Sequence, residues 1–133
     1  MRAAVALLAV LLAGCASTPG PESRWVPPFG ANAVFDTAPG AAPRQRLIVN
    51  DLRLPAGAVG ATHYHPWEEY LYVIEGSAVL DMEGREPRTL VAGESVIIPA
   101  RQVHTPRAGE EGVRGIVVRV HDEGDPERIE VGE

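Results

Sequence analysis

Three histidines and one glutamate have the residue types and the spacing of a metal site. His63 and His65 are two positions apart on a segment expected to be extended, so both rings point to the same side of the strand. Glu69 opens the aromatic and β-branched run that follows, and His104 lies in a later, turn-rich segment. Together these side chains offer three nitrogens and one oxygen, which is a ligand set for a divalent transition metal.

The donor set leaves the identity of the metal open. Imidazole suits zinc, copper, iron and nickel, and the carboxylate also admits manganese. Four protein ligands could close a tetrahedral zinc site or leave two positions open on an octahedral ion. A divalent ion with one carboxylate keeps a positive charge, so we expect a small anionic molecule as partner. All three imidazoles must be neutral to bind, so the metal should be lost as the pH falls through about 6.

The segment that holds these residues resembles the first conserved motif of the cupin superfamily. In that motif a glycine, a His-x-His pair, a glutamate and a second glycine stand at fixed distances, and every fixed position is matched by Gly57, His63, His65, Glu69 and Gly76. The second cupin motif is matched by Gly93, Pro99 and His104. Two positions depart from it, with Arg101 in place of a turn glycine and Ala108 in place of an asparagine.

The resemblance implies an all-β, single-domain cupin-type jelly-roll β-barrel, or double-stranded β-helix, with the metal held by His63, His65, Glu69 and His104. It also implies a homodimer, because family members often pair. Independently of the family, residues 46–54, 69–74, 78–82, 95–98 and 113–120 have the composition of short strands. We expect turns at Glu83-Gly84, Ala92-Gly93 and Ala108-Gly109.

Strand alternation predicts which neighbours of the metal ligands face the substrate pocket. Leu71 and Val73 share the parity of Glu69 and should line the pocket, whereas Glu68, Tyr70 and Tyr72 should face away from it.

Other residues near the motifs have competing interpretations. Gln102 shares the parity of His104 and is a candidate polar group of the pocket. Arg101 could clamp a substrate carboxylate or be a solvated turn residue, and Trp67 could cover the mouth of the pocket or fill a turn. His121 lies outside both motifs among acidic residues, which favours a surface role, and Met82 is expected in the core.

The N-terminus resembles a bacterial lipoprotein signal peptide. Arg2 is followed by an apolar run too short to span a bilayer and then by Leu12-Ala-Gly-Cys15. By this resemblance Cys15, the only cysteine, is acylated and becomes the mature N-terminus, which would anchor the protein in the cell envelope. Ala16 after the cysteine favours the outer membrane, facing the periplasm. The alternative is an ordinary signal peptide with an incidental cysteine.

The rest of the chain is organised around one barrel. We expect a signal peptide at 1–14, a lipidated Pro/Gly-rich tether and arm at 15–45, the barrel at 46–121 and an acidic tail at 122–133. Trp25, Val26, Phe29, Val34 and Phe35 are too apolar for a free linker, so part of the arm should pack on the barrel or on a second subunit.

Composition excludes several classes of function. The chain has 18 acidic against 12 basic residues, so nucleic acid is not an expected partner. It contains no lysine, which excludes Schiff-base catalysis.

Three hypotheses remain. The first is a metalloenzyme with dioxygenase-like chemistry on an anionic organic substrate, favoured because two open positions on the ion would let it hold substrate and oxygen together. Lyase, decarboxylase or isomerase chemistry is less favoured, because no second acid or base is evident beside the ligands. The second is a non-catalytic binding module for a small anion or a metal. The third is a structural dimeric barrel that the metal braces.

Overall fold

The computed structural model describes residues 25–132, which form eight β-strands and no helix. The strands are β1 (Gly30–Thr37), β2 (Gln45–Leu54), β3 (His63–Tyr64), β4 (Glu69–Met82), β5 (Arg88–Val91), β6 (Ser95–Ile98), β7 (His104–Asp122) and β8 (Ile129–Glu130). Within this range no helix has the length and apolarity that crossing a membrane requires. The predicted signal peptide and Cys15 lie outside the described residues. The all-β prediction is confirmed.

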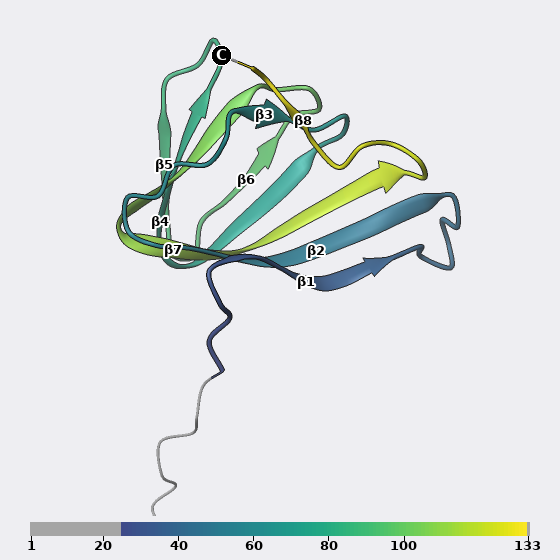
Figure 1. The fold of residues 1–133 in the computed structure, drawn as a ribbon, viewed down its shortest axis with the longest axis horizontal. Coiled ribbons are helices and arrows are strands. Elements are labelled where there is room, and N and C mark those ends of the chain that lie inside the picture. Colours follow the sequence, from purple (N-terminus) through teal and green to yellow (C-terminus); the bar gives the residue numbers. More distant parts are fainter. Residues whose placement is uncertain (1–24, 133) are drawn as a thin grey trace, which may run out of the picture.

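Two long antiparallel strands, β4 and β7, form the backbone of the fold. They pair from Glu69 opposite Arg119 to Met82 opposite His104, and two bulges near Gly76 interrupt the register. Bulges increase local bend and twist, so the sheet curls back on itself. The strands β2 and β1 extend one side of the curl and β5 and β6 pair with the far edge of β4, while β3 and β8 cross one end (Figure 1).

Apolar side chains fill the inside of the curl, because alternate residues of each strand point inward. On β4 the inward set includes Leu71, Val73 and Leu80, whose exposures are 5 %, 0 % and 1 %. Met82 is buried with them, as predicted. Tyr70 and Tyr72 alternate with this set and lie exposed on the outer face, also as predicted. The remaining members of the core are Ala78, Leu90, Val96, Ile98, Ala108, Val113 and Val117.

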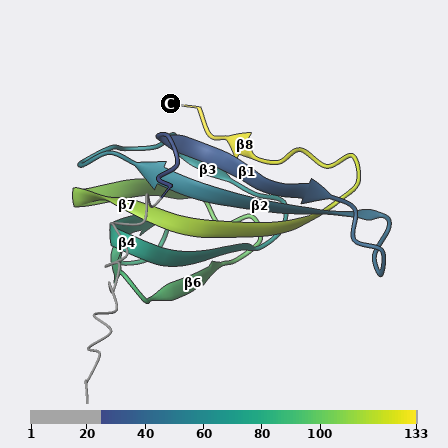
Figure 2. The ribbon, with the colours of Figure 1, turned by 90° about the horizontal axis from the view of Figure 1, so that it is seen from below.

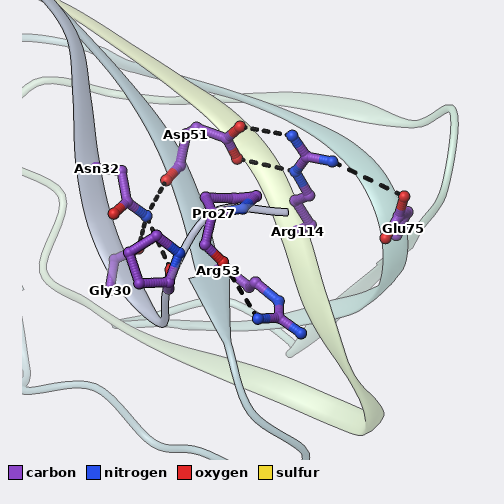
Figure 3. Close-up of polar contacts among 8 residues, drawn as sticks. Pro27, Gly30, Asn32, Asp51, Arg53, Glu75 and Arg114 are labelled. Atoms are coloured by element: carbon purple, nitrogen blue, oxygen red, sulfur yellow. Dashed lines mark hydrogen bonds and ion pairs between the residues drawn. The ribbon is translucent and has the colours of Figure 1, made fainter. Parts of the chain in front are cut away.

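The N-terminal arm contributes a strand to the sheet. Strand β1 pairs with β2 along its whole length, and the two run side by side in Figure 2. Pro27 is fully buried, and the side-chain amide of Asn32 donates to the carbonyls of Pro28, Gly30 and Asp51 (Figure 3). Phe29 lies under the Arg53 guanidinium, 4.3 Å from ring centroid to Cζ. The arm therefore packs on the barrel, which is one of the two partners that we expected for it.

Three other boundaries differ from the predictions. The runs 69–74 and 78–82 belong to one strand, β4, and the predicted turn at Ala108-Gly109 lies inside the continuous strand β7. Gly109 packs closely there, because a Cβ at this position would lie 2.0 Å from Ser77 Oγ and would require that side chain to rotate. The segment 122–133, predicted as an acidic tail, also contains the short strand β8, which pairs with β3.

Glycines of the two motifs adopt backbone conformations that other residues avoid. Gly57, Gly76 and Gly93 have φ values of 67°, 69° and 91°, in the left-handed region. Arg101, which replaces a turn glycine of the family pattern, keeps the same conformation with φ of 61°. Its N–H donates to the carbonyl of His65 over 2.8 Å, so the turn fixes the backbone of a predicted metal ligand.

Candidate metal centre

Three imidazoles converge at one end of the curled sheet. His63 begins β3 and is directly opposite His104 at the start of β7, and His65 follows β3 on the same side of the chain. All three are buried, and one ring nitrogen of each lies within 4.8 Å of the other two. The short strand β3 positions two of the rings because residues two apart share a face.

Backbone carbonyls hold all three rings by the same nitrogen. The Nδ1 atoms of His63, His65 and His104 lie 2.7, 2.5 and 3.0 Å from the carbonyl oxygens of Ala61, Glu127 and Gln102. A carbonyl can only accept, so Nδ1 carries the proton and Nε2 keeps a bare lone pair in each neutral ring. This is the orientation in which histidines bind metals.

The bare Nε2 atoms face one another. Those of His63 and His65 are 3.1 Å apart, and Nε2 of His104 is buried with no hydrogen-bond partner among the described residues. Several buried acceptors that point at one place are costly unless a cation or proton satisfies them. The arrangement therefore fits a divalent metal ion, and these three residues are the ones that would hold it.

Glu69 lies beside the three histidines at the start of β4. One of its carboxylate oxygens is 2.9 Å from Nε2 of His65 and 3.8 Å from a guanidinium nitrogen of Arg119. Burial raises the pKa of this carboxyl. A hydrogen bond from Nε2 of His65, formed when that nitrogen carries a proton instead of a metal, and the positive charge of Arg119 hold the pKa below its usual value. Glu69 is thus an anion at neutral pH, placed where it could complete the ligand set.

Burial lowers the pKa of His63 and outweighs the opposing effect of the hydrogen bond between its Nδ1 and the carbonyl of Ala61. The ring is consequently neutral at neutral pH, which is the state that binds a metal.

His121 lies in the protein interior, so the predicted surface role is wrong. Its exposure is 2 %, and its ring centroid is 6.2 Å from that of His65. Neither ring nitrogen has a hydrogen-bond partner within residues 25–132. Burial lowers its pKa, as do the charges of Arg119 and His65, against the opposing effect of Glu127. His121 is therefore neutral and packs near the His65 ring. Its inward parity on β7, shared with Arg119, could have indicated this from the sequence.

A cavity of about 410 Å³ opens beside this cluster and includes His63 and Glu69 in its wall. Its apolar wall comes from strands β1, β2 and β7 and from the β2–β3 connection. The other polar residues of the cavity wall were not predicted from the sequence. They are Asn50, Arg119, Glu127 and Arg128. Arg119 could have been noticed as a lone charge inside the apolar run 116–120, whereas Glu127 and Arg128 reach the cavity only because β8 folds back onto β3.

None of the five residues predicted to line the substrate pocket is among those that line this cavity. Leu71 and Val73 are in the core, and neither is among the residues that line this cavity. The Gln102 side chain donates to the carbonyls of Glu83 and Val103. Arg101 is exposed on its turn, and the Trp67 indole donates to Asp125 over 2.8 Å. Trp67 therefore fixes the loop that carries Glu127.

Comparison with known proteins agrees with this geometry. A family model described as "Cupin domain" matches residues 50–119. Dimethylsulfoniopropionate lyase DddQ of Ruegeria pomeroyi is 34 % identical over 65 residues, which are 49 % of this chain and 32 % of that protein. The chain thus spans about a third of the length of that relative.

Solved structures show the same fold. That of the Ruegeria pomeroyi lyase gives a TM-score of 0.59 at 23 % identity, covering 78 % of this chain and 54 % of that one. Oxalate decarboxylase from Bacillus subtilis gives 0.61 at 24 %, over 77 % of this chain and 28 % of the other. A cupin-like protein from Thermotoga maritima gives 0.60 at 20 %, over 77 % and 75 %. With its motifs, its curled sheet and its three-histidine cluster, the chain belongs to the cupin family.

Proposed function

We propose that this protein is a metal-dependent enzyme that binds and transforms a small organic anion. The observation that carries the proposal is the convergence of three bare Nε2 atoms beside a cavity. A divalent ion held by His63, His65, His104 and Glu69 would supply Lewis-acid or redox chemistry. A structural metal would need no cavity at its side.

The cavity fits a small organic acid. Its volume lies in the range of small-molecule sites, at about 300–1,000 Å³. Leu52, Leu54 and Val117 provide apolar wall, and two arginines provide positive charge. The relatives are named for dimethylsulfoniopropionate and for oxalate, which are both small carboxylates.

Two reaction classes fit this site. Oxidation by dioxygen needs little help from acid or base side chains, and it remains our leading proposal. Elimination or decarboxylation needs a proton acceptor or donor, and the Glu127 carboxylate in the cavity wall is one that the sequence did not reveal. The 34 % identity to a lyase also favours this second class. A module that only binds an anion would show no turnover in either case.

We also propose that the protein works at the cell envelope, tethered through a lipid on Cys15. The support for this is the sequence Leu12-Ala-Gly-Cys15 after a short apolar run. Mass spectrometry of the protein from its native membrane would test it, because acylation adds a defined mass to the N-terminal cysteine.

Turnover assays distinguish the reaction classes. The full-length chain would be purified in mild detergent, loaded with one metal at a time, and incubated with oxalate, dimethylsulfoniopropionate and simple 2-oxo and 2-hydroxy acids. Oxygen uptake with loss of substrate supports oxidation, and oxygen-independent loss supports the lyase or decarboxylase class. Loss of activity in His63→Ala ties turnover to the site. A metal-loaded protein that transforms none of these acids, or that works equally well as His63→Ala, contradicts the proposal.

A further inference from the structure

We infer that Arg119 is the anchor for the carboxylate of the organic ligand, and that Glu127 occupies this anchor until the ligand displaces it. The inference rests on the proposed function, because it assigns the ligand of the same cavity. It makes the ligand a carboxylate with a short apolar body.

Arg119 is a buried cation in the wall of the cavity. Its side chain is 7 % exposed, although a guanidinium inside a protein normally needs a full set of partners. One terminal nitrogen, Nη2, is 2.7 Å from the Glu127 carboxylate, and Nη1 is 3.8 Å from Glu69. The third nitrogen, Nε, is buried and has no hydrogen-bond partner among residues 25–132.

Other arginines of this protein show what a complete pairing looks like. Arg114 donates to the two carboxylate oxygens of Asp51 from Nε over 3.1 Å and from Nη2 over 2.7 Å (Figure 3). Arg46 binds both oxygens of Asp36 through the same two nitrogens. Of the same two nitrogens, Nε and Nη2, Arg119 uses only Nη2 to bind Glu127. A carboxylate that accepted from both nitrogens would therefore be held more tightly than Glu127 is.

Glu127 can leave without unfolding the site. Its side chain is 45 % exposed, whereas that of Arg119 is almost completely buried. Its backbone carbonyl accepts the 2.5 Å hydrogen bond from Nδ1 of His65, and this bond does not involve the carboxylate. Rotation of the Glu127 side chain would therefore free the arginine while the backbone still orients the metal-ligating ring.

The position of Arg119 places such a ligand beside the metal cluster. Its guanidinium approaches the same Glu69 oxygen that lies 2.9 Å from Nε2 of His65. Leu52 and Val117 line the same cavity and provide apolar surface for the rest of the molecule. A small aliphatic monocarboxylate thus matches both the charge and the walls.

Arginine-detected NMR with propionate tests the inference. In the full-length chain loaded with Zn²⁺, which is diamagnetic, propionate should move the Nε–H resonance of Arg119 downfield as this group gains an acceptor. Propionamide, which has no charge, should leave the resonance in place. Arg119→Lys identifies the resonance and should weaken propionate binding about tenfold or more, because two charge-assisted bonds become one. Glu127→Gln should bind propionate more tightly, since a neutral amide competes less well for the arginine.

Arg46→Lys is the matched control, because Arg46 also pairs with a carboxylate but is not among the residues that line the cavity. It should leave propionate affinity unchanged. The inference is overturned if propionate binds without moving the Arg119 resonance, if Glu127→Gln does not tighten binding, or if neither it nor the wild type binds propionate at all. The metal content of each sample is measured in parallel. A protein that holds no metal but shows the Arg119 response would contradict the proposed function and leave this inference standing.

Discussion

A single methyl group on Gly76 should damage the fold far more than one on Gly84. Both glycines have positive φ, 69° and 74°, so alanine at either position has the same backbone penalty. A Cβ at Gly84 meets no heavy atom within 4 Å, whereas a Cβ at Gly76 would lie 2.1 Å from the carbonyl oxygen of Gly112 and 2.9 Å from its carbon. These contacts are with backbone, which cannot rotate away.

The cost can be worked out from these contacts. Left-handed backbone costs a non-glycine residue about 1–2 kcal/mol, and this is the whole expected loss for Gly84→Ala. Relief of the 2.1 Å contact in Gly76→Ala requires β4 and β7 to separate where Gly76 pairs with Val113. Overpacking typically adds about 1–3 kcal/mol and a lost ladder hydrogen bond about 1 kcal/mol. The expected difference between the two variants is therefore about 2–4 kcal/mol.

Urea unfolding of both variants and the wild type measures this difference directly. We expect Gly84→Ala to lower the midpoint by the backbone penalty alone and Gly76→Ala to lower it much further, because it loses about 2–4 kcal/mol more of a stability that is about 5–15 kcal/mol in typical domains. Equal midpoints for the two variants would refute the reasoning, because they share the φ penalty and differ only in the contact with Gly112.

The remaining predictions concern charge and pH. Asp51→Asn should lower the melting temperature more than Asp36→Asn, because the pair of Asp51 with Arg114 is largely buried and that of Asp36 is exposed; equal shifts would contradict this. In metal-free protein, the urea midpoint should fall as the pH drops through 6.5, because the lowered pKa values of His63 and His121 let the unfolded chain bind protons that the folded chain does not. A midpoint that is constant or rises from pH 7.5 to 5.5 would contradict it. Bound metal should be released as the pH falls through about 6, and retention at pH 4 would count against histidine ligation.

The three-histidine cluster could be predicted because its geometry is mostly local. The His63-x-His65 spacing on an extended segment places two rings on one side, and only the pairing of β3 with β7 brings in His104. The run 95–98, which is rich in β-branched residues, was predicted as a strand with its observed limits. Met82 and the outward tyrosines followed from side-chain alternation along the strand.

What could not be predicted depends on pairing between distant segments. Strand β1 lies in a Pro/Gly-rich stretch, and none of its residues is buried, so its sequence has no strand pattern. Only its pairing with β2 makes it a strand. Glu127 reaches the cavity because two residues of β8 pair with β3, which is too short a strand to show a pattern. Leu71 and Val73 have the predicted inward parity, yet they point into the core because the cavity opens nearer to β2 than to the middle of β4.

The most direct test of the metal centre is elemental analysis by mass spectrometry of the full-length protein, purified without chelator or a metal affinity step. The wild type should contain close to one divalent transition metal per chain, and His104→Ala should have lost it while keeping its β-sheet circular dichroism. His121→Gln is the control, since His121 is equally buried but lies outside the cluster, and it should retain the metal. A wild type without metal, or a His104→Ala variant with unchanged metal content, would contradict the assignment of this site.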